Sequence, residues 1–246
     1  MTYTTPAGST YRIYSDMLKQ THILIAGATG SGKSTIVNGI VTNALYKSPR
    51  EVGFILIDPK RVELREYADL PHTMAYVRQF EQLPIAFKSV LDMVNIRLAD
   101  MERKRLRMYD GSDIYVIIDE FMPIMTNKET REAVLPILQE ILAIARCARV
   151  HVILCTQSPI TRVIPTEIKC NFSSVVALKT NTAQDSRNII GMKGCERFPD
   201  PQIEGRAWAY YRHGCTTDLY DVPRYTDEER RRVIEHWTGR AHIFAS

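Results

Sequence analysis

Several features that would place a chain in a special class are scarce in this sequence. The five cysteines are Cys147, Cys155, Cys170, Cys195 and Cys215. They are odd in number, widely spaced and without a C-x-x-C pair, so they indicate neither a disulfide framework nor a zinc site. The first residues lack the charged start and apolar stretch of a signal peptide, and no window approaches about eighteen uninterrupted apolar residues. We therefore expect a reducing, cytoplasmic setting and no direct membrane insertion.

Charge of one sign is also in small excess, because Lys and Arg outnumber Asp and Glu by only 32 to 28. A net charge of +4 permits nucleic-acid binding without requiring it. No internal repeat, low-complexity tract or linker rich in Gly, Pro or Ser interrupts the chain. We therefore predict one domain over residues 1–246, with an N-terminal hairpin or extension in residues 1–20 and a short C-terminal helix in residues 225–238.

Apolar runs and helical periodicity alternate along the chain. The runs that predict strands are His22 to Ala26, Phe54 to Ile57, Tyr115 to Ile118, His151 to Cys155, Val175 to Leu178 and Ala207 to Tyr211. The first four are continuously apolar, as strands covered on both faces of a parallel sheet are. Periodic segments predict helices over Thr35 to Tyr46, Phe87 to Met101 and Val134 to Ala145. This alternation predicts an α/β fold with a mostly parallel central sheet flanked by helices.

The segment between the first strand and the first helix matches the phosphate-binding pattern G-x-x-x-x-G-K-[ST]. Its glycines let backbone N–H groups approach phosphate oxygens, and the helix N-terminus adds its dipole. We expect Lys33 to contact the β and γ phosphates of ATP and the Ser34 hydroxyl to bind Mg²⁺. The required strand and helix flank the motif, so we reject an ordinary glycine-rich turn. The predicted nucleotide-binding residues are Gly27, Ala28, Thr29, Gly30, Ser31, Gly32, Lys33, Ser34 and Thr35.

Two further strands end in polar residues that suit hydrolysis. Asp119 follows the strand at Tyr115 to Ile118 and is expected to hold Mg²⁺, as a Walker B aspartate does. Glu120, the next residue, is placed to orient and polarise the attacking water. Gln157 follows the strand at His151 to Cys155, where it would sense the γ-phosphate or position that water. With Lys33, these residues form a predicted hydrolytic site.

Taken together, these and further segments resemble the motor domain of the FtsK/SpoIIIE family of DNA translocases, within the FtsK-HerA superfamily of P-loop ATPases. The most specific signatures are Asp58-Pro59-Lys60 with Glu63-Leu64, and Asp185-Ser186-Arg187. The others are Pro71-His72, Met101-Glu102-Arg103, Asp119-Glu120-Phe121, Ala145-Arg146 ahead of His151, and Thr156-Gln157 with Pro159. The resemblance spans roughly residues 11–237. Ser158 and Val150 depart from it, because the family usually has Arg and Gly there.

The resemblance implies a RecA-like ATPase that assembles as a hexameric ring and pumps double-stranded DNA through its pore. In ring ATPases an arginine from the neighbouring subunit stabilises charge on the transferring phosphoryl group. Arg146, Arg149 and Arg187 are candidates, and Arg146 is favoured because it matches the family arginine ahead of the strand at His151. DNA contacts are expected in the loops Met122 to Arg131 and Ile160 to Lys169. Their basic residues are Lys128, Arg131, Arg162 and Lys169.

The leading functional prediction is an ATP-driven translocase of double-stranded DNA from a phage, plasmid or conjugative element. DNA transfer and packaging both remain open, and a relaxase, a portal or a membrane protein is an expected partner. The alternative is an ATP-dependent ring that binds DNA or a partner without translocating. The pair Asp119 and Glu120 argues against it, because a module that only binds has no need of the second acid. A small-molecule kinase is a third class, but it would be expected to have an arginine-rich lid and an acceptor pocket. The sequence shows no such lid, although Arg103 to Arg107 could be mistaken for one.

Overall fold

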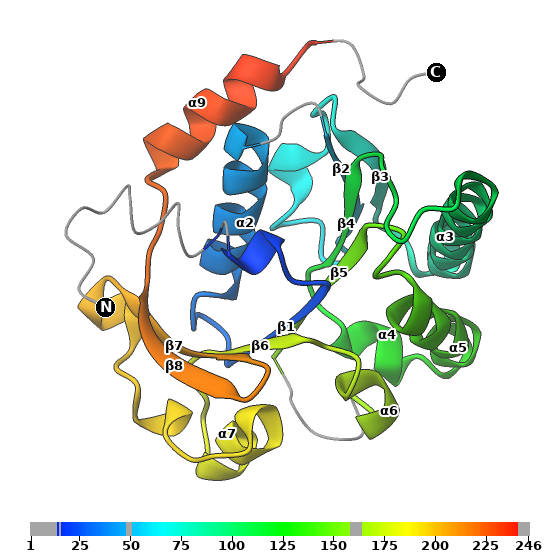
Figure 1. The fold of residues 1–246 in the computed structure, drawn as a ribbon. Coiled ribbons are helices and arrows are strands. Elements are labelled where there is room, and N and C mark those ends of the chain that lie inside the picture. The colour runs from blue at the N-terminus through cyan, green and yellow to red at the C-terminus, as the bar shows by residue number, and fades with distance from the viewer. Residues whose placement is uncertain (1–13, 15, 48–50, 158–163, 241–246) are drawn as a thin grey trace.

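The structure is a computed structural model that describes residues 14, 16–47, 51–157 and 164–240. The described residues contain an eight-stranded sheet with the order β3-β2-β4-β5-β1-β6-β7-β8 (Figure 1). Its strands are β1 (His22–Ala26), β2 (Val52–Ile57), β3 (Thr73–Val77), β4 (Asp113–Ile118), β5 (Val150–Thr156), β6 (Ser174–Ala177), β7 (Ala207–His213) and β8 (Thr216–Val222). The first six pair in parallel, and β7 and β8 complete the sheet antiparallel. The predicted mostly parallel α/β fold is confirmed.

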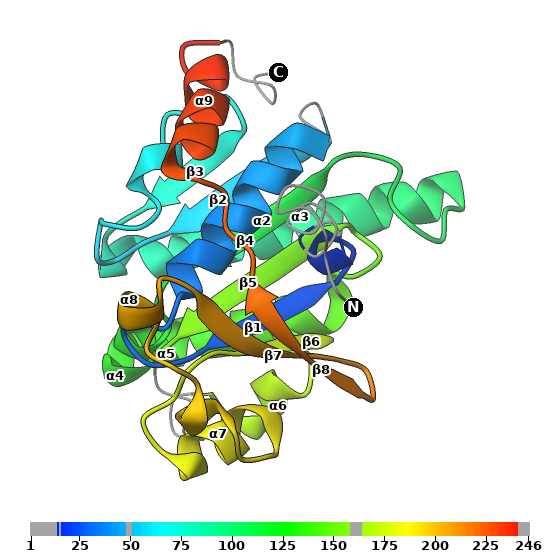
Figure 2. The same ribbon diagram turned by 90° about the vertical axis from the view of Figure 1, so that its left-hand side faces the viewer.

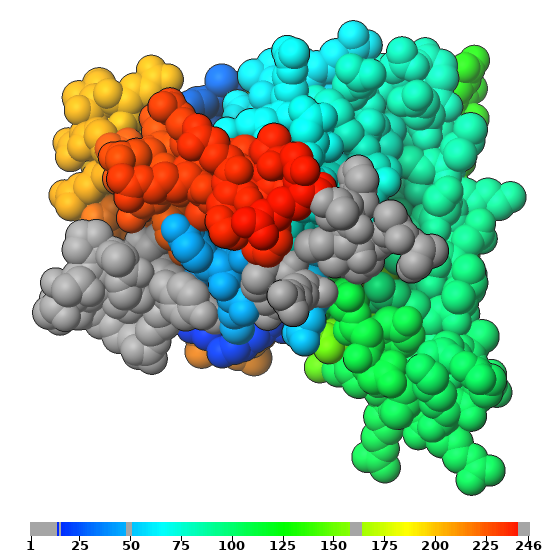
Figure 3. All heavy atoms as spheres, turned by 90° about the horizontal axis from the view of Figure 1, so that it is seen from above, coloured from blue at the N-terminus to red at the C-terminus, as the bar shows by residue number. Residues whose placement is uncertain are grey.

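Helices cover both faces of this sheet. The α-helices are α2 (Lys33–Lys47), α3 (Leu83–Lys104), α4 (Met122–Thr126), α5 (Lys128–Ile144), α6 (Thr166–Lys169), α7 (Ala183–Ile190), α8 (Pro201–Glu204) and α9 (Asp227–Trp237). Three short 3₁₀ segments accompany them: η1 (Arg65–Tyr67), η2 (Phe80–Gln82) and η3 (Cys195–Arg197). Helices α2 and α9 lie on one face, whereas α3 and α5 lie on the other (Figure 1). Figure 3 shows α9, in orange and red, beside α2.

The continuous apolar strands of the sequence are explained by this layering. Successive side chains of a strand point to opposite faces, so a central strand buries every residue. In β1, Leu24 packs into the core under α3 and α5, whereas Ile23 and Ile25 pack into the core under α2. All five residues of β1 and all six of β2 are buried. Burial of each such Leu or Ile contributes about 1.5–3 kcal/mol.

Three expectations need correction or completion. Strands β3 and β8 were not predicted, because they lie at the edges of the sheet, where neither is continuously buried and β8 is mostly exposed. The predicted loop Met122 to Arg131 is wrong: it contains helix α4 and the first turn of α5. The Asn127 side chain caps α5 by accepting a hydrogen bond from the Thr130 N–H at 2.9 Å. Likewise, the end of the predicted loop Ile160 to Lys169 is helix α6.

The two chain ends were assigned to accessory elements. The hairpin predicted over residues 3–14 lies outside the described residues except for Tyr14. The C-terminal helix is present as α9, and it begins with a capping box in which Thr226 and Glu229 exchange side-chain and backbone hydrogen bonds. Among the helices of the described residues, none has the length and apolar character needed to cross a membrane.

Candidate ATPase site

The phosphate-binding loop lies between β1, which ends at Ala26, and α2, which begins at Lys33. Gly30 and Gly32 have φ angles of +75° and +104°, a region that side chains disfavour. At Gly27, an added Cβ would lie 2.6 Å from Ser31 Oγ. The conformation of this loop therefore favours glycine at these three positions. Helix α8 lies beside the start of α2 (Figure 2), where the Gln202 side chain approaches Gly30.

Lys33 lies over this loop rather than in solvent. Its ammonium donates hydrogen bonds to the carbonyl oxygens of Gly27 and Ala28, both at 2.9 Å. Burial lowers the pKa of Lys33, although the charges of Cys155 and Glu120 oppose that shift. The Ser31 hydroxyl is buried, and within the described residues it has no hydrogen-bond partner. A lysine held by two carbonyls beside an unpaired hydroxyl suits a ligand rich in acceptor oxygens, and ATP phosphates fit this loop.

The acid pair follows β4 at the same edge of the sheet. The Asp119 N–H donates to Ile57 O at 3.0 Å, so Asp119 lies directly beside the end of β2. Burial raises the pKa of Asp119 to about 7, with further contributions from the nearby charges of Asp58 and Glu63. A bound dication would stabilise this carboxylate in its ionised form. The surroundings of Asp119 therefore fit the predicted Mg²⁺.

Glu120 is held in one orientation by main-chain donors. Its side chain is only 3% exposed. Oxygen Oε1 accepts hydrogen bonds from the N–H groups of Met122 at 3.3 Å and Gln157 at 3.2 Å. Gln157 in turn accepts a hydrogen bond at 2.8 Å from the Thr29 hydroxyl of the phosphate-binding loop. The predicted residues Gln157 and Glu120 are thus brought together with the loop.

Sequence reasoning assigned no role to Asp58 and Lys60, although both belong to the quoted Asp58-Pro59-Lys60 signature. Lys60 Nζ lies 3.5 Å from Glu120 Oε2. The contacts therefore run without interruption from Thr29 through Gln157 and Glu120 to Lys60. They connect the ends of β1, β5, β4 and β2, which are neighbours in the sheet. A Lys two residues beyond a strand-end acid, in a parallel sheet, was the signal that could have assigned Lys60 to the site.

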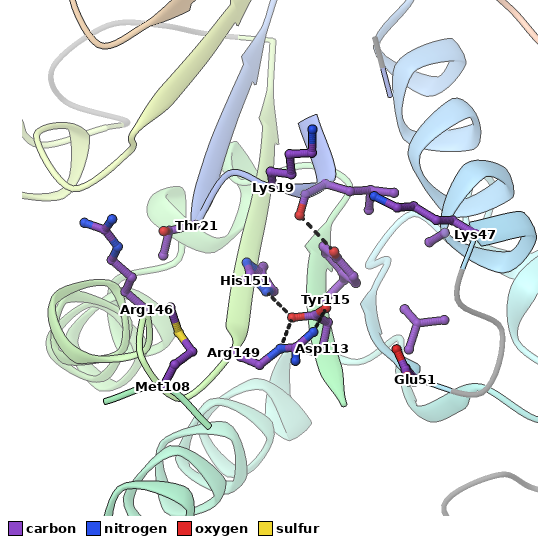
Figure 4. A pocket seen from close by; sticks show the side chains of 13 residues that line it. Lys19, Thr21, Lys47, Glu51, Met108, Asp113, Tyr115, Arg146, Arg149 and His151 are labelled. Atoms are coloured by element: carbon purple, nitrogen blue, oxygen red, sulfur yellow. Dashed lines mark hydrogen bonds and ion pairs between the residues drawn. The ribbon is translucent and has the colours of Figure 1, made fainter. Parts of the chain in front are cut away.

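Two candidate arginines lie on the opposite side of the sheet from the phosphate-binding loop, at the N-terminal ends of β4 and β5. Arg149 forms two hydrogen bonds with Asp113, at 2.8 and 2.6 Å, and His151 Nε2 lies 2.9 Å from the same carboxylate. Although burial alone would raise the pKa of Asp113, these hydrogen bonds from Arg149 and His151 lower it to about 2. The three side chains line a cavity of about 490 Å³ (Figure 4).

Arg146 lines the same cavity and is exposed. Among the described residues no hydrogen bond or ion pair engages its guanidinium. The seven residues of β5 separate this edge from Gln157, a distance of roughly 20 Å at about 3.3 Å per residue. Arg146 therefore cannot reach the phosphate-binding loop of its own chain. Arg187, the third candidate, is exposed on α7 and donates to Gln184 Oε1 at 3.1 Å.

The basic residues predicted to contact DNA are in different environments. Lys128 and Arg131 lie in the first turn of α5, where Lys128 forms an exposed ion pair with Glu132 at 4.0 Å. Lys169 is partly buried and donates a hydrogen bond to the carbonyl of Asn188. Burial lowers the pKa of Lys169. Arg162 lies outside the described residues.

Comparison with known proteins agrees with this geometry. The model of the FtsK/SpoIIIE family matches residues 5–113, which include the phosphate-binding loop and the Asp58-Pro59-Lys60 signature. The DNA translocase FtsK of Lactococcus lactis subsp. cremoris is 36% identical over 206 residues, which cover 74% of this chain and 27% of that protein. The chain carries an FtsK/SpoIIIE-family ATPase domain. The DNA translocase SpoIIIE of Bacillus subtilis is 33% identical over 209 residues, 76% of this chain and 26% of that protein.

This FtsK/SpoIIIE-family domain thus spans about a quarter of the length of those curated relatives. Among solved structures, the pCW3 conjugation coupling protein TcpA, determined with ATPγS, has a TM-score of 0.73 and 22% identity. The likeness covers 90% of this chain and 66% of that one. It shows the same fold. The predicted family resemblance and the P-loop ATPase class are confirmed.

Proposed function

We propose that this domain hydrolyses ATP and uses the energy to move double-stranded DNA as a ring-shaped motor. The observation that carries the proposal is the continuous set of contacts across four adjacent strand ends, which joins Thr29, Gln157, Glu120 and Lys60. A domain that only bound ATP would need the phosphate-binding loop alone. The buried glutamate beside Asp119 supports hydrolysis in addition to binding.

Lys33 and the start of α2 would bind the phosphates of ATP. The lysine exchanges the two loop carbonyls for β- and γ-phosphate oxygens, and the first N–H groups of α2 point toward the same anion. Ser34 and Asp119 would hold Mg²⁺, which supplies positive charge to the phosphate oxygens when bound. The Thr29 hydroxyl, now bonded to Gln157, becomes available when the loop closes on the ligand.

Hydrolysis requires an oriented water at the γ-phosphate. Glu120 would accept a proton from that water while the oxygen of the water forms a bond to the γ-phosphorus. The bond between that phosphorus and the bridging oxygen breaks, and the negative charge of the leaving ADP is stabilised by Lys33. Gln157 would position the water or sense the γ-phosphate, because it lies between Thr29 and Glu120. The step belongs to general base catalysis with electrostatic stabilisation.

The remaining positive charge would come from a second copy of the chain. Arg146 is unpaired in the described part of the chain and lies at the sheet edge opposite its own phosphate-binding loop. A ring in which this edge of one subunit faces the loop of the next would bring Arg146 to the γ-phosphate. Arg149 is less suited to that role, because its guanidinium already donates hydrogen bonds to both carboxylate oxygens of Asp113.

For DNA, exposure favours Lys128 over Lys169, whose ammonium is engaged by Asn188, and Arg131 lies in the same first turn of α5 as Lys128. The proposed setting is a phage, plasmid or conjugative element, with a relaxase, a portal or a membrane protein as partner. TcpA is named as a conjugation coupling protein, but at 22% identity it is similar in fold alone, so DNA transfer and packaging both remain open. A hexameric state and a cytoplasmic location stay predictions.

The proposal is tested by measuring ATP turnover with and without duplex DNA, alongside displacement of a third strand from a DNA triplex. A mass measurement with a slowly hydrolysed ATP analogue gives the oligomeric state. We expect DNA to stimulate turnover, the triplex strand to be displaced and a ring to form. The Lys33→Ala variant, which should not bind ATP, is the control. A monomer indifferent to DNA would overturn the proposal, and stimulated turnover without displacement would favour the binding ring.

A further inference from the structure

We infer that Lys60 is a positioning residue that holds the Glu120 carboxylate in the orientation needed to bind the attacking water. The inference rests on the proposed function and adds a residue to it. Its first support is the complete fixation of Glu120. Oxygen Oε1 is held by two main-chain N–H groups, and oxygen Oε2 faces Lys60 Nζ at 3.5 Å. Each carboxylate oxygen therefore has its own partner, so the side chain cannot rotate without breaking contacts.

The second support is the rigidity of the segment that carries Lys60. The Asp58 carboxylate is fully buried. It accepts hydrogen bonds from the Arg61 N–H at 2.8 Å, the Leu64 N–H at 3.1 Å and the Tyr76 hydroxyl at 3.3 Å. Because Pro59 also restricts its own backbone, Lys60 starts from a fixed point on this turn.

The third support is the balance of charge around Glu120. The carboxylates of Asp58, Glu63 and Glu120 all lie close enough to Asp119 for their charges to act on it. In the described residues, the lysines acting on this group are Lys33 and Lys60. Lys33 is bonded to the phosphate-binding loop and is needed for phosphate. Lys60 is therefore the cation left to keep Glu120 in place among its acidic neighbours.

The burial of the pair distinguishes it from an ordinary surface ion pair. Lys60 is 43% exposed, whereas the Glu120 side chain is 3% exposed. The lysine thus covers the carboxylate from the solvent side. In contrast, the pair Lys128–Glu132 is exposed at both ends, at 78% and 60%. Removing the partner of a buried carboxylate disturbs it far more than removing an exposed partner does.

The test is the steady-state ATPase of Lys60→Met, measured with duplex DNA, together with the dissociation constant of a fluorescent ATP analogue. We expect kcat to fall about tenfold to a hundredfold while the dissociation constant stays within about twofold. Lys60→Arg, which keeps the charge, should recover kcat to within about threefold of wild type. Loss of ATP affinity in proportion to kcat would instead make Lys60 a substrate-binding residue and overturn the inference.

A double-mutant cycle with Glu120→Gln separates positioning from a general effect on the fold. If Lys60 acts through Glu120, Lys60→Met should cause no further loss of kcat in the Glu120→Gln background. A full additional loss there would overturn the inference. Unchanged kcat in the single variant would do the same. Wild-type turnover in the same assay distinguishes these outcomes from failure of the proposed function, because an inactive wild type refutes the latter.

Lys104→Met is the matched control. Lys104 is 42% exposed, close to the value for Lys60, and forms an ion pair with Asp100 at 2.8 Å on α3. It has no place in the proposed site, so its kcat should equal that of wild type. The melting temperatures of both variants show whether each is folded. If Lys60→Met melts below the assay temperature, Lys60→Gln and Lys60→Arg carry the same comparison.

Discussion

At the scale of single residues, His22 shows how the central strand limits the pH range of the fold. It is 1% exposed at the start of β1, and its Nδ1 accepts the Val152 N–H at 3.0 Å. Burial, with a smaller contribution from the charge of His151, lowers the pKa of His22 to about 3. Because the folded pKa lies below the unfolded value of about 6.5, the unfolded chain binds the proton first. The contribution of neutral His22 to stability is therefore fully present above the unfolded pKa of about 6.5, and it is lost as the pH falls toward 3.

His22→Gln should weaken this pH dependence. As the pH falls from about 6.5 to about 5, the loss of unfolding free energy due to His22 should steepen toward about 1.4 kcal/mol per pH unit, because the proton uptake on unfolding rises toward one. Glutamine keeps a hydrogen-bond acceptor near the Val152 N–H but does not titrate. Urea unfolding at several pH values in this range measures the slope for both proteins. Equal slopes would show that His22 does not titrate as its burial requires.

Glu120→Gln isolates the proposed base from the binding of ATP. We expect the variant to bind ATP with unchanged affinity, because an amide oxygen still accepts the N–H groups of Met122 and Gln157. Turnover should fall by about 10²–10⁴-fold, because the amide cannot take a proton from water. Single-turnover hydrolysis and a binding titration measure the two quantities. Residual turnover within about threefold of wild type would remove Glu120 from the role of base.

At the scale of elements, helix α2 is fixed by a contact that depends on a glycine in its middle. The ring of the buried Tyr14 lies against Gly39, so that an added Cβ would be 2.0 Å from Tyr14 Cζ. The Tyr14 hydroxyl donates to the Pro223 carbonyl at 2.6 Å. Tyr14 thereby connects α2 to the segment that leads into α9. Alanine favours helices over glycine by about 1 kcal/mol, yet this helix keeps the glycine because packing outweighs that preference.

Gly39→Ala should therefore destabilise the domain, by about 1–3 kcal/mol of unfolding free energy. In a Tyr14→Ala background the same change should be neutral or stabilising, because the ring that clashes has gone. Denaturant unfolding of the four proteins in this cycle gives the coupling between the two positions. A stabilising Gly39→Ala in the wild-type background would show that the helix shifts away from Tyr14 without cost.

The elements also show what the sequence could and could not predict. Strands β1, β2, β4 and β5 were predicted because central strands bury both faces and therefore read as apolar runs. Edge strands such as β8 carry no such pattern, since one face and one hydrogen-bonding side meet solvent. The segment Met122 to Arg131 was expected to be a loop because it contains few apolar residues in helical spacing. The second of its two helices, α5, begins at the Asn127 cap.

The candidate site follows the same division. Its phosphate-binding loop and acid pair were predictable because each is a local pattern with a fixed place after a strand. The partnership of Lys60 with Glu120 was not, because it depends on β2 and β4 being neighbours in register, from Ile57 beside Ile118. Local sequence does not specify which parallel strands are adjacent. The isolation of Arg146 from its own loop depends instead on the seven-residue length of β5, which places the two at opposite ends of the strands.

At the scale of the whole molecule, the two ends of the parallel strands carry groups that would act together in a ring. The proposed ATP site lies at one edge, and Arg146 lies at the other. In a ring, Arg146→Ala should bind ATP normally but turn over about 10³-fold more slowly or worse, because each site lacks its neighbour's arginine. Mixing this variant into wild type should reduce activity more steeply than its mole fraction. ATPase assays across a series of mixing ratios measure that curve.

The control for this experiment is Arg187→Ala, which removes an exposed arginine from α7. A linear loss with the fraction of Arg146→Ala would show that subunits act alone. A steep loss for Arg187→Ala, with none for Arg146→Ala, would transfer the role to the Asp185-Ser186-Arg187 signature. Arg149→Ala should instead lower the melting temperature, because it leaves the partly buried Asp113 without its main partner.

Strand β5 connects the proposed ATP site to the turn that carries Arg146. It begins beside Arg149 and ends at Thr156, next to Gln157, so a single seven-residue segment runs from one end of the strands to the other. A strand clamped between β4 and β1 is stiff along its length. If ATP binding displaced Gln157, β5 would therefore move as a rigid element and displace the turn that carries Arg146. In the proposed ring, β5 would thereby couple the nucleotide site of one subunit to the arginine that the same subunit presents to the next.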